Sequence, residues 1–379
     1  MPADHEVAVL VGNGLSVAFN PGLNLKTITE EVMRRIEAAD GDDAVVAMKE
    51  LAERALPDGV TSGDDFEQLV GAFGAESRTL STLETLATLT SPQDKKLRKS
   101  IRRVSSFAER VRDNGVSHVL EVICERTRAN HDNAADLHAL IAAILDAFDG
   151  RIVFGNLNYD TLLLAALMHV CNNTELADLA DGRPQATVTV TVNDEEELEV
   201  QSLRRTSTDF PASRRVRLLH LHGSLTYWGN KDRTLFAKLP KELLDDGDQW
   251  KAVRERTTNV RPAVVLANPR DKAQHVNEYP FNLAYKMFKR GLVRADHWLI
   301  IGYSFKDAPV NNTLREEFLD YEEKPSVLVV TYGPSPKREE IERAFGWGAD
   351  DPDSRAWLSI NRRGANGVQD TNHWKRFVP

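Results

Sequence analysis

Short apolar runs rich in β-branched residues alternate with helical segments along this chain of 379 residues. Runs of this kind are typical of buried strands, because they are too short and too β-branched for helices. Between the later runs, the spacing of apolar residues predicts helices at about 277–292 and 309–320. The strand-like runs are residues 7–12, 151–160, 215–224, 263–269, 297–304 and 326–333. This alternation predicts an α/β fold with a doubly wound, mostly parallel, Rossmann-like sheet.

A long helical region interrupts this pattern. Residues 61–149 have helical spacing without a convincing strand, so we expect an all-helical lobe inserted after the first strand and helix. Residues 187–202 alternate around a turn-like Asn-Asp pair, which predicts a hairpin insertion at about 186–203. The expected organisation is a sheet lobe of residues 1–60 and 150–345, the helical lobe, and an irregular C-terminal tail of residues 346–379.

The charge balance argues against a uniformly basic surface for nucleic acid. The formal net charge is -9 and the pI is about 5.7, although residues 95–103 (KKLRKSIRR) are strongly basic. We interpret this stretch as a solvated helix face. The two cysteines, Cys124 and Cys171, cannot form a disulfide framework or a four-thiolate zinc site, and we expect both to be small buried residues.

The location of the protein is predicted from the same composition. The first residues lack the basic and apolar regions of a signal peptide, and no apolar run is long enough to span a bilayer. We therefore expect a cytoplasmic protein without membrane contact.

Polar and glycine-rich clusters follow four of the predicted strands. Ligands of open parallel sheets bind beyond the carboxyl ends of the strands, where these clusters lie. Each cluster alone is common in packing, but four at one edge predict a ligand site. The clusters contain Gly12, Asn13, Gly14, Ser16, Asn158, Tyr159, Asp160, His222, Gly223, Ser224, Gly302, Tyr303, Ser304 and Asp307.

The first cluster, GNGLS at residues 12–16, is the most informative. It lacks the Lys of a P-loop and is not the GxGxxG fingerprint. It nevertheless brings backbone amides and a helix start together, which suits a diphosphate. Its glycines can equally serve packing. For Asp160 the alternative to a role in the ligand site is a cap of the next helix. His220 alternates with His222 along the strand, so we expect it to face away from His222, into the core.

Four motifs in this order resemble the sirtuin superfamily, and most closely the sirtuin-like NAD-hydrolysing proteins of bacterial antiviral defence. GNGLS stands where sirtuins carry a Gly-Ala-Gly-x-Ser turn over the NAD diphosphate. NLNYD matches their Gln-Asn-x-Asp at Asn158 and Asp160, with Leu157 in place of Gln. LHGS matches the segment of the catalytic His at His222, and GYS replaces Gly-Thr-Ser. DDFEQLV, residues 64–70, resembles a Phe-Glu helix of defence-type relatives.

The departures from the family also have consequences. Protein-deacylating sirtuins carry a four-cysteine zinc ribbon after the His segment, whereas Cys124 and Cys171 both precede it here. We therefore expect no bound metal, and deacylation is the least favoured of the activities considered.

The resemblance implies an NAD glycohydrolase, with NAD as substrate. In that reading Asn158 orients the ribose and the attacking water, His222 accepts a proton, and Asp160 holds the nicotinamide pocket or orients Asn158. The NAD-binding residues implied are Gly12, Asn13, Gly14, Ser16, Gly223, Gly302, Tyr303, Ser304 and Asp307. The competing interpretation is a non-catalytic NAD or ADP-ribose binding module that serves as a scaffold or sensor.

The resemblance also implies partners. We expect a homo-oligomer whose activity depends on assembly or on a partner ATPase of the hexameric translocase type. Nucleic acid is expected to be involved only indirectly.

Overall fold

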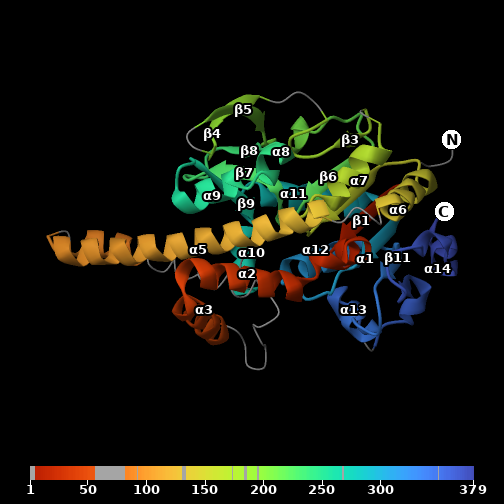
Figure 1. Cartoon of the computed structure of the whole chain (residues 1–379). Coiled ribbons are helices and arrows are strands. Elements are labelled where there is room, and N and C mark those ends of the chain that lie inside the picture. The colour runs from red at the N-terminus through yellow and green to blue at the C-terminus, as the bar shows by residue number, and fades with distance from the viewer. Residues whose placement is uncertain are drawn as a thin grey trace.

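A computed structural model describes residues 5–55, 82–91, 93–129, 134–172, 174–182, 186–193, 196–266, 269–348 and 350–379. The segment 64–70, for which we predicted a Phe-Glu helix, lies outside these residues. Two sheets and a layer of helices make up the described part of the chain (Figure 1).

The larger sheet has seven strands in the order β12-β11-β10-β1-β2-β6-β3, and every neighbouring pair is parallel. The sequence prediction of a doubly wound, mostly parallel, Rossmann-like sheet is confirmed. The strands are β1 (Val7–Val11), β2 (Ile152–Asn156), β3 (Leu176–Ala177), β6 (Val216–His220), β10 (His297–Ile301), β11 (Ser326–Val330) and β12 (Leu358–Asn361).

Helices cover both faces of this sheet, which is why its central strands are apolar throughout. Alternate residues of β1 enter different cores: Ala8 and Leu10 pack with α11 (Phe281–Arg294) and α12 (Ala308–Asp320). Val7, Val9 and Val11 pack on the other side. The helices of that side are α1 (Asn13–Phe19), α6 (Ala134–Ala147), α7 (Leu162–Val170) and α14 (Asn372–Phe377).

The second sheet is antiparallel, with the strand order β4-β5-β8-β7-β9. Its first two strands form the predicted hairpin. The prediction that residues 263–269 add a strand to the parallel sheet is wrong, because β9 pairs antiparallel with β7. A short apolar run does not reveal which sheet it joins. The strands are β4 (Thr187–Thr191), β5 (Glu197–Ser202), β7 (Gly223–Asn230), β8 (Phe236–Lys238) and β9 (Val260–Val264).

The run expected as one strand at 215–224 is divided between the two sheets. The parallel strand β6 ends at His220, and the antiparallel strand β7 begins at Gly223. Gly223 has a φ of 89°, and a Cβ built there lies 2.1 Å from the Ala263 carbonyl oxygen. Only glycine fits this position, because the backbone is left-handed and β9 passes directly beside it.

The helices α2, α3, α5, α8 and α9 pack with the second sheet around one core that includes Ile28, Val119, Trp228 and Trp250. Helix α6, from the same predicted helical region as α5, packs instead on the parallel sheet. The helices are α2 (Leu25–Asp40), α3 (Asp42–Ala55), α5 (Lys95–Ala129), α8 (Lys241–Asp245) and α9 (Asp248–Glu255). Among the described helices, none has both the length and the apolar composition to cross a membrane.

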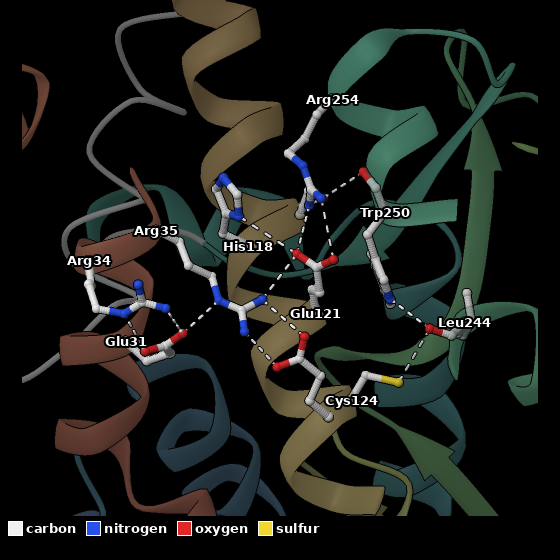
Figure 2. A network of polar contacts seen from close by, with 11 residues as sticks. Glu31, Arg34, Arg35, His118, Glu121, Cys124, Leu244, Trp250 and Arg254 are labelled. Carbon is white, nitrogen blue, oxygen red and sulfur yellow. Dashed lines mark hydrogen bonds and ion pairs between the residues drawn. The ribbon is translucent and has the colours of Figure 1, made fainter. Parts of the chain in front are cut away.

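A half-buried network of charges joins α2, α5 and α9 (Figure 2). The Glu121 carboxylate on α5 lies 2.8 Å from Nη1 of Arg254 and 3.2 Å from Nη1 of Arg35. Arg35 also contacts Glu125, at 2.6 Å, and Glu31, at 2.8 Å. Burial alone raises the pKa of Glu121, but His118 and the two arginines outweigh it and hold this pKa below its usual value.

The C-terminal segment differs from the irregular tail that we expected. It adds the four-residue strand β12 to the edge of the parallel sheet and ends in α14. Trp374 and Phe377 of α14 are buried in the core beneath that sheet. The apolar residues of these two short elements are too few to produce a recognisable period, which explains why the sequence pattern did not reveal them.

Candidate functional site

A pocket of about 470 Å³ lies beyond the carboxyl ends of β1, β2, β6 and β10. These four strands are neighbours in the sheet, so the four predicted clusters come together. Ser16, Gly223 and Ser224 lie outside the lining. The predicted residues that line the pocket are Gly12, Asn13, Gly14, Asn158, Tyr159, Asp160, His222, Gly302, Tyr303, Ser304 and Asp307.

Glycines form one side of the pocket by packing against each other. The amide of Gly14 donates to the carbonyl of Gly302 at 2.9 Å. A Cβ built on Gly14 lies 2.6 Å from the Gly302 Cα, and one built on Gly12 lies 2.7 Å from the Gly302 oxygen. Gly302 itself has a φ of 66°. Packing therefore explains the glycines of GNGLS, because the backbone of the β1–α1 turn lies directly against the backbone at the end of β10.

The hydroxyl of Ser16 joins the first two clusters beneath the pocket. Its Oγ donates to Oδ2 of Asp160 at 2.6 Å and accepts from Nδ2 of Asn158 at 2.8 Å. Nδ2 of Asn158 also donates to the Gly12 carbonyl at 3.0 Å. Ser16 is 1% exposed, so its hydroxyl serves this chain of hydrogen bonds and does not line the pocket.

Asp160 combines a capping contact with a place in the pocket lining. Its Oδ1 accepts from the backbone N–H of Leu162 at 3.0 Å, at the start of α7. Asp160 thus contacts the helix start, although the N-cap position of α7 that we considered for it is occupied by Thr161. Burial raises the pKa of Asp160, while the hydrogen bonds from Ser16 and Leu162 oppose the rise.

His222 lies in the turn between the two sheets and faces the pocket. Its Nε2 is 3.2 Å from the Tyr285 hydroxyl and 3.6 Å from Oδ2 of Asp307. His220 lies elsewhere, with Nδ1 3.4 Å from Nδ2 of Asn156 and its ring edge-on to Tyr227. Burial lowers the pKa of His220 to about 4. His222 thus lines the pocket and His220 is a neutral core residue.

Asp307 lies between two cationic or ionisable side chains. Nζ of Lys272 is 2.7 Å from its Oδ2, and His222 is next to the same oxygen. Its Oδ1 accepts from the Val310 amide at 3.1 Å and caps α12. Burial raises the pKa of Asp307, but His222 and Lys272 outweigh it and hold this pKa below its ordinary value.

The sequence analysis did not identify Lys272 or Tyr285. Lys272 belongs to the short helix α10 (Pro269–His275), which follows the strand predicted at 263–269. The signal that could have identified Lys272 is its position just past the end of that predicted strand. Tyr285 lies within α11 and had no motif around it.

Tyr303 supports the pocket through its loop. Its hydroxyl donates toward the Asp307 carbonyl at 3.1 Å and lies 2.8 Å from Oδ1 of Asn311. The side chain is 5% exposed, and burial raises its pKa well above the ordinary value. The phenol therefore holds the segment 302–307 in place, while Ser304 beside it is exposed.

Apolar side chains form another part of the pocket lining. They are Leu23 just before α2, Leu25 and Ile28 in the first turns of α2, and Ile123 of α5. These residues were not predicted from the sequence as part of the site, because apolar positions of a helix look alike whether they face a core or a ligand. The pocket therefore combines a polar strand-end surface with an apolar helical surface, as ligand sites commonly do.

Metal-ligating side chains gather away from this pocket. Among the described residues, the group that comes close enough to hold an ion is His5, Asp296 and His297. These residues lie at the amino ends of β1 and β10, whereas the pocket lies at the carboxyl ends. The lining itself offers an imidazole, carboxylates, an amide and an ammonium group, which suit proton transfer and the binding of a polar ligand.

Comparisons with known proteins identify one matching family. No curated protein sequence matches the chain. The chain is similar to a solved structure titled "Structural Basis for the Mechanism and Regulation of Sir2 Enzymes", at 13% identity and a TM-score of 0.30 over 64% of this chain and 68% of that one. The family described as SIR2-like domain matches residues 153–349, which is more than half of the sequence. The chain therefore belongs to the SIR2-like domain family.

Proposed function

We propose that this protein is an NAD glycohydrolase that cleaves NAD to nicotinamide and ADP-ribose. The observation that carries the proposal is the meeting of Asn158 and His222 in one pocket at the carboxyl edge of the parallel sheet. Membership of the SIR2-like family adds support, because the family name points to NAD chemistry. The glycine-lined turn at residues 12–14 and the segment 302–304 are the surfaces on which the diphosphate rests in this proposal.

The reaction requires one bond to break and one to form at the ribose. The bond from C1′ to the nicotinamide nitrogen breaks, and its electron pair stays with nicotinamide. The oxygen of water bonds to C1′, and His222 takes the proton that this water releases. The sugar gains oxocarbenium character on the way, so oriented acceptors near the ribose lower the barrier.

The contacts of the two key side chains suit these roles. The hydrogen bonds of the Asn158 side chain to Gly12 and Ser16 use its amide nitrogen, which leaves the amide oxygen to orient a ribose hydroxyl or the water. Asp307, 3.6 Å from Nε2 of His222, stabilises the imidazolium that forms. Asp160 acts through Ser16 on the orientation of Asn158.

The test is incubation of the full-length protein with NAD and chromatography of nicotinamide, ADP-ribose and cyclic ADP-ribose. His222→Ala is expected to abolish nicotinamide release. His220→Ala is expected to keep the wild-type rate of nicotinamide release per folded molecule. Full activity of a folded His222→Ala protein rules out the proposed mechanism.

A binding module without turnover is the second candidate, and one observation favours it. Asn158, Ser16 and Asp160 form a continuous chain of hydrogen bonds that has a structural role on its own. Calorimetry separates the two functions: a scaffold or sensor binds NAD or ADP-ribose and releases no nicotinamide.

We further propose that the enzyme is the NAD-depleting effector of a bacterial antiphage defence system, on the strength of the sequence resemblance. Unrestrained NAD depletion harms the cell that makes it, so activity is expected to depend on self-assembly or on a translocase-type ATPase. The test compares nicotinamide release by the purified chain alone and with the product of a neighbouring gene, if that gene encodes a translocase-type ATPase, and light scattering reports the assembly state. Equal rates with and without the ATPase contradict this regulation.

A further inference from the structure

Helix α5 changes character halfway along its length. At 1.5 Å per residue its 35 residues extend about 52 Å. From Ser117 onward it is largely buried against α2, α9 and the second sheet. Its first half is mainly exposed, and Figure 1 shows this half extending beyond the two sheets. A helix that protrudes in this way presents its side chains to a partner.

The exposed half of α5 carries a concentrated positive charge. With Arg256, the C-cap of α9, it forms a shallow groove in which no described lining residue is acidic. This contrasts with the chain as a whole, whose formal net charge is -9. The residues that line this groove, here called the basic groove, are Lys95, Arg98, Lys99, Arg102, Arg103, Ser106, Phe107, Arg110 and Arg256.

The positions of these cations favour an extended ligand. Lys95, Lys99 and Arg103 recur every four residues, which places them along one face of the helix. Like charges at this spacing destabilise an isolated helix. Arg102 offsets part of this cost, since its Nε lies 2.9 Å from a carboxylate oxygen of Glu84. Among the described residues, Lys99 and Arg103 have no such ion pair.

We infer that the basic groove binds the phosphodiester backbone of a nucleic acid. Most of its cations are arginines, whose planar guanidinium groups bind phosphate oxygens in pairs. Phe107 is 55% exposed, and the guanidinium carbon of Arg110 lies 5.6 Å from the centre of its ring. An exposed aromatic ring beside arginines offers a surface on which a base can stack. These features favour nucleic acid over an acidic polypeptide.

This binding surface is separate from the proposed NAD chemistry. None of the residues that line the basic groove lines the strand-end pocket. The inference therefore stands or falls independently of the hydrolase proposal, and it revises our expectation that nucleic acid is involved only indirectly.

The test is fluorescence anisotropy of the full-length protein with labelled single-stranded DNA, duplex DNA and poly-glutamate over a series of salt concentrations. The variant is the double substitution Lys99→Glu and Arg103→Glu. The matched control is Lys375→Glu and Arg376→Glu, two exposed residues of α14, which Figure 1 shows far from the free end of α5.

Wild type and control are expected to bind DNA with an affinity that falls steeply with salt. The groove variant is expected to bind about tenfold or more weakly, with the slope of log affinity against log salt reduced by about 1.5 to 2 because two phosphate contacts are lost. Its nicotinamide release is expected to remain that of wild type if the chain is an NAD hydrolase. Equal DNA binding by groove variant and control, tighter binding of poly-glutamate than of DNA, or no DNA binding by wild type overturns the inference.

Discussion

The hydroxyl of Ser16 donates a 2.6 Å hydrogen bond to the Asp160 carboxylate, across 144 residues of sequence. The bond ties the helix that follows β1 to the loop that follows β2. Asn158, which donates to the same hydroxyl, is held by this bond as well. The arrangement of Asn158 and Asp160 in the pocket therefore depends on a side chain that is not part of the pocket lining.

Substitution Ser16→Ala tests this dependence. The variant leaves Oδ2 of Asp160 buried without its donor, so we expect a loss of about 1 to 3 kcal/mol in the free energy of unfolding. Nicotinamide release is expected to fall as Asn158 loses its fixed orientation. Chemical denaturation and turnover are measured together. Ser304→Ala, an exposed residue of the pocket lining, is the control and is expected to unfold like wild type.

Gly14→Ala separates packing from ligand binding at the first turn. Its methyl group meets the Gly302 backbone at 2.6 Å, and backbone cannot move aside cheaply. We expect a lower melting temperature, together with weaker NAD binding in calorimetry. In the control Gly348→Ala the nearest atom lies 3.8 Å away, so little change is expected. A Gly14→Ala protein as stable as wild type contradicts the packing explanation.

His220 makes stability depend on pH over a defined range. Its pKa is lowered from 6.5 to about 4 in the folded protein, so the unfolded chain binds the additional proton first. The contribution of neutral His220 to the free energy of unfolding is complete above the unfolded pKa of 6.5. It is lost as the pH falls toward the folded pKa of about 4. Melting curves at several pH values are expected to show a smaller acid loss in His220→Gln than in wild type. The control His373→Gln, on α14, is expected to retain the wild-type pH dependence.

Asp307→Asn is expected to reduce turnover without unfolding the protein. Asparagine caps a helix about as well as aspartate, so α12 is preserved. The substitution removes the negative charge beside His222 and Lys272, so the imidazolium formed during the reaction is less stable. We expect kcat to fall by about tenfold or more, with a smaller change in KM and an altered pH–rate profile.

The matched control for Asp307 lies outside the pocket. Asp353 also caps a helical turn, with its side chain accepting from the Arg355 amide. Asp353→Asn is expected to leave turnover unchanged. If both variants lose activity equally, the effect of Asp307 is structural and its role beside His222 is rejected.

Glu121→Gln is expected to loosen the helical layer. The Glu121 side chain is 12% exposed and neutralises Arg35 and Arg254, so its loss leaves two half-buried cations short of a counter-charge (Figure 2). We expect a decrease of about 2 to 4 kcal/mol in the free energy of unfolding. Glu125, on the same helix and also paired with Arg35, is 54% exposed. Denaturation of Glu125→Gln is expected to show a loss of less than about 1 kcal/mol.

The parallel sheet and the gathering of polar clusters were predictable from local sequence. Central parallel strands are buried on both faces, so β1, β10 and β11 are visible as apolar runs. Since the carboxyl ends of such strands share one edge, Asn158 and His222 were expected to meet without knowledge of any contact. The free cysteines are also buried, as expected, and burial raises the pKa of Cys124 to about 12 and of Cys171 to about 11.

What the sequence left undetermined depends on contacts between distant segments. Nothing near Ser16 indicates that its hydroxyl bonds to Asp160, and nothing near Gly14 indicates that Gly302 lies against it. The second sheet was missed for a related reason, because its strands β7 and β9 look like continuations of a parallel pattern. Pairing partners are a property of the whole fold and not of the segment.

The contact between Gly12, Gly14 and Gly302 limits how the pocket can move. These backbones touch without any side chain between them, so the β1–α1 turn and the end of β10 form one rigid unit. Rigid backbone contacts leave no freedom for the two segments to separate when a ligand arrives. The apolar part of the lining is formed instead by the side chains of Leu25 and Ile28 of α2 and Ile123 of α5. We therefore expect a ligand to be accommodated by side-chain movement in this apolar part of the lining, while the backbones of the β1–α1 turn and the end of β10 stay in place.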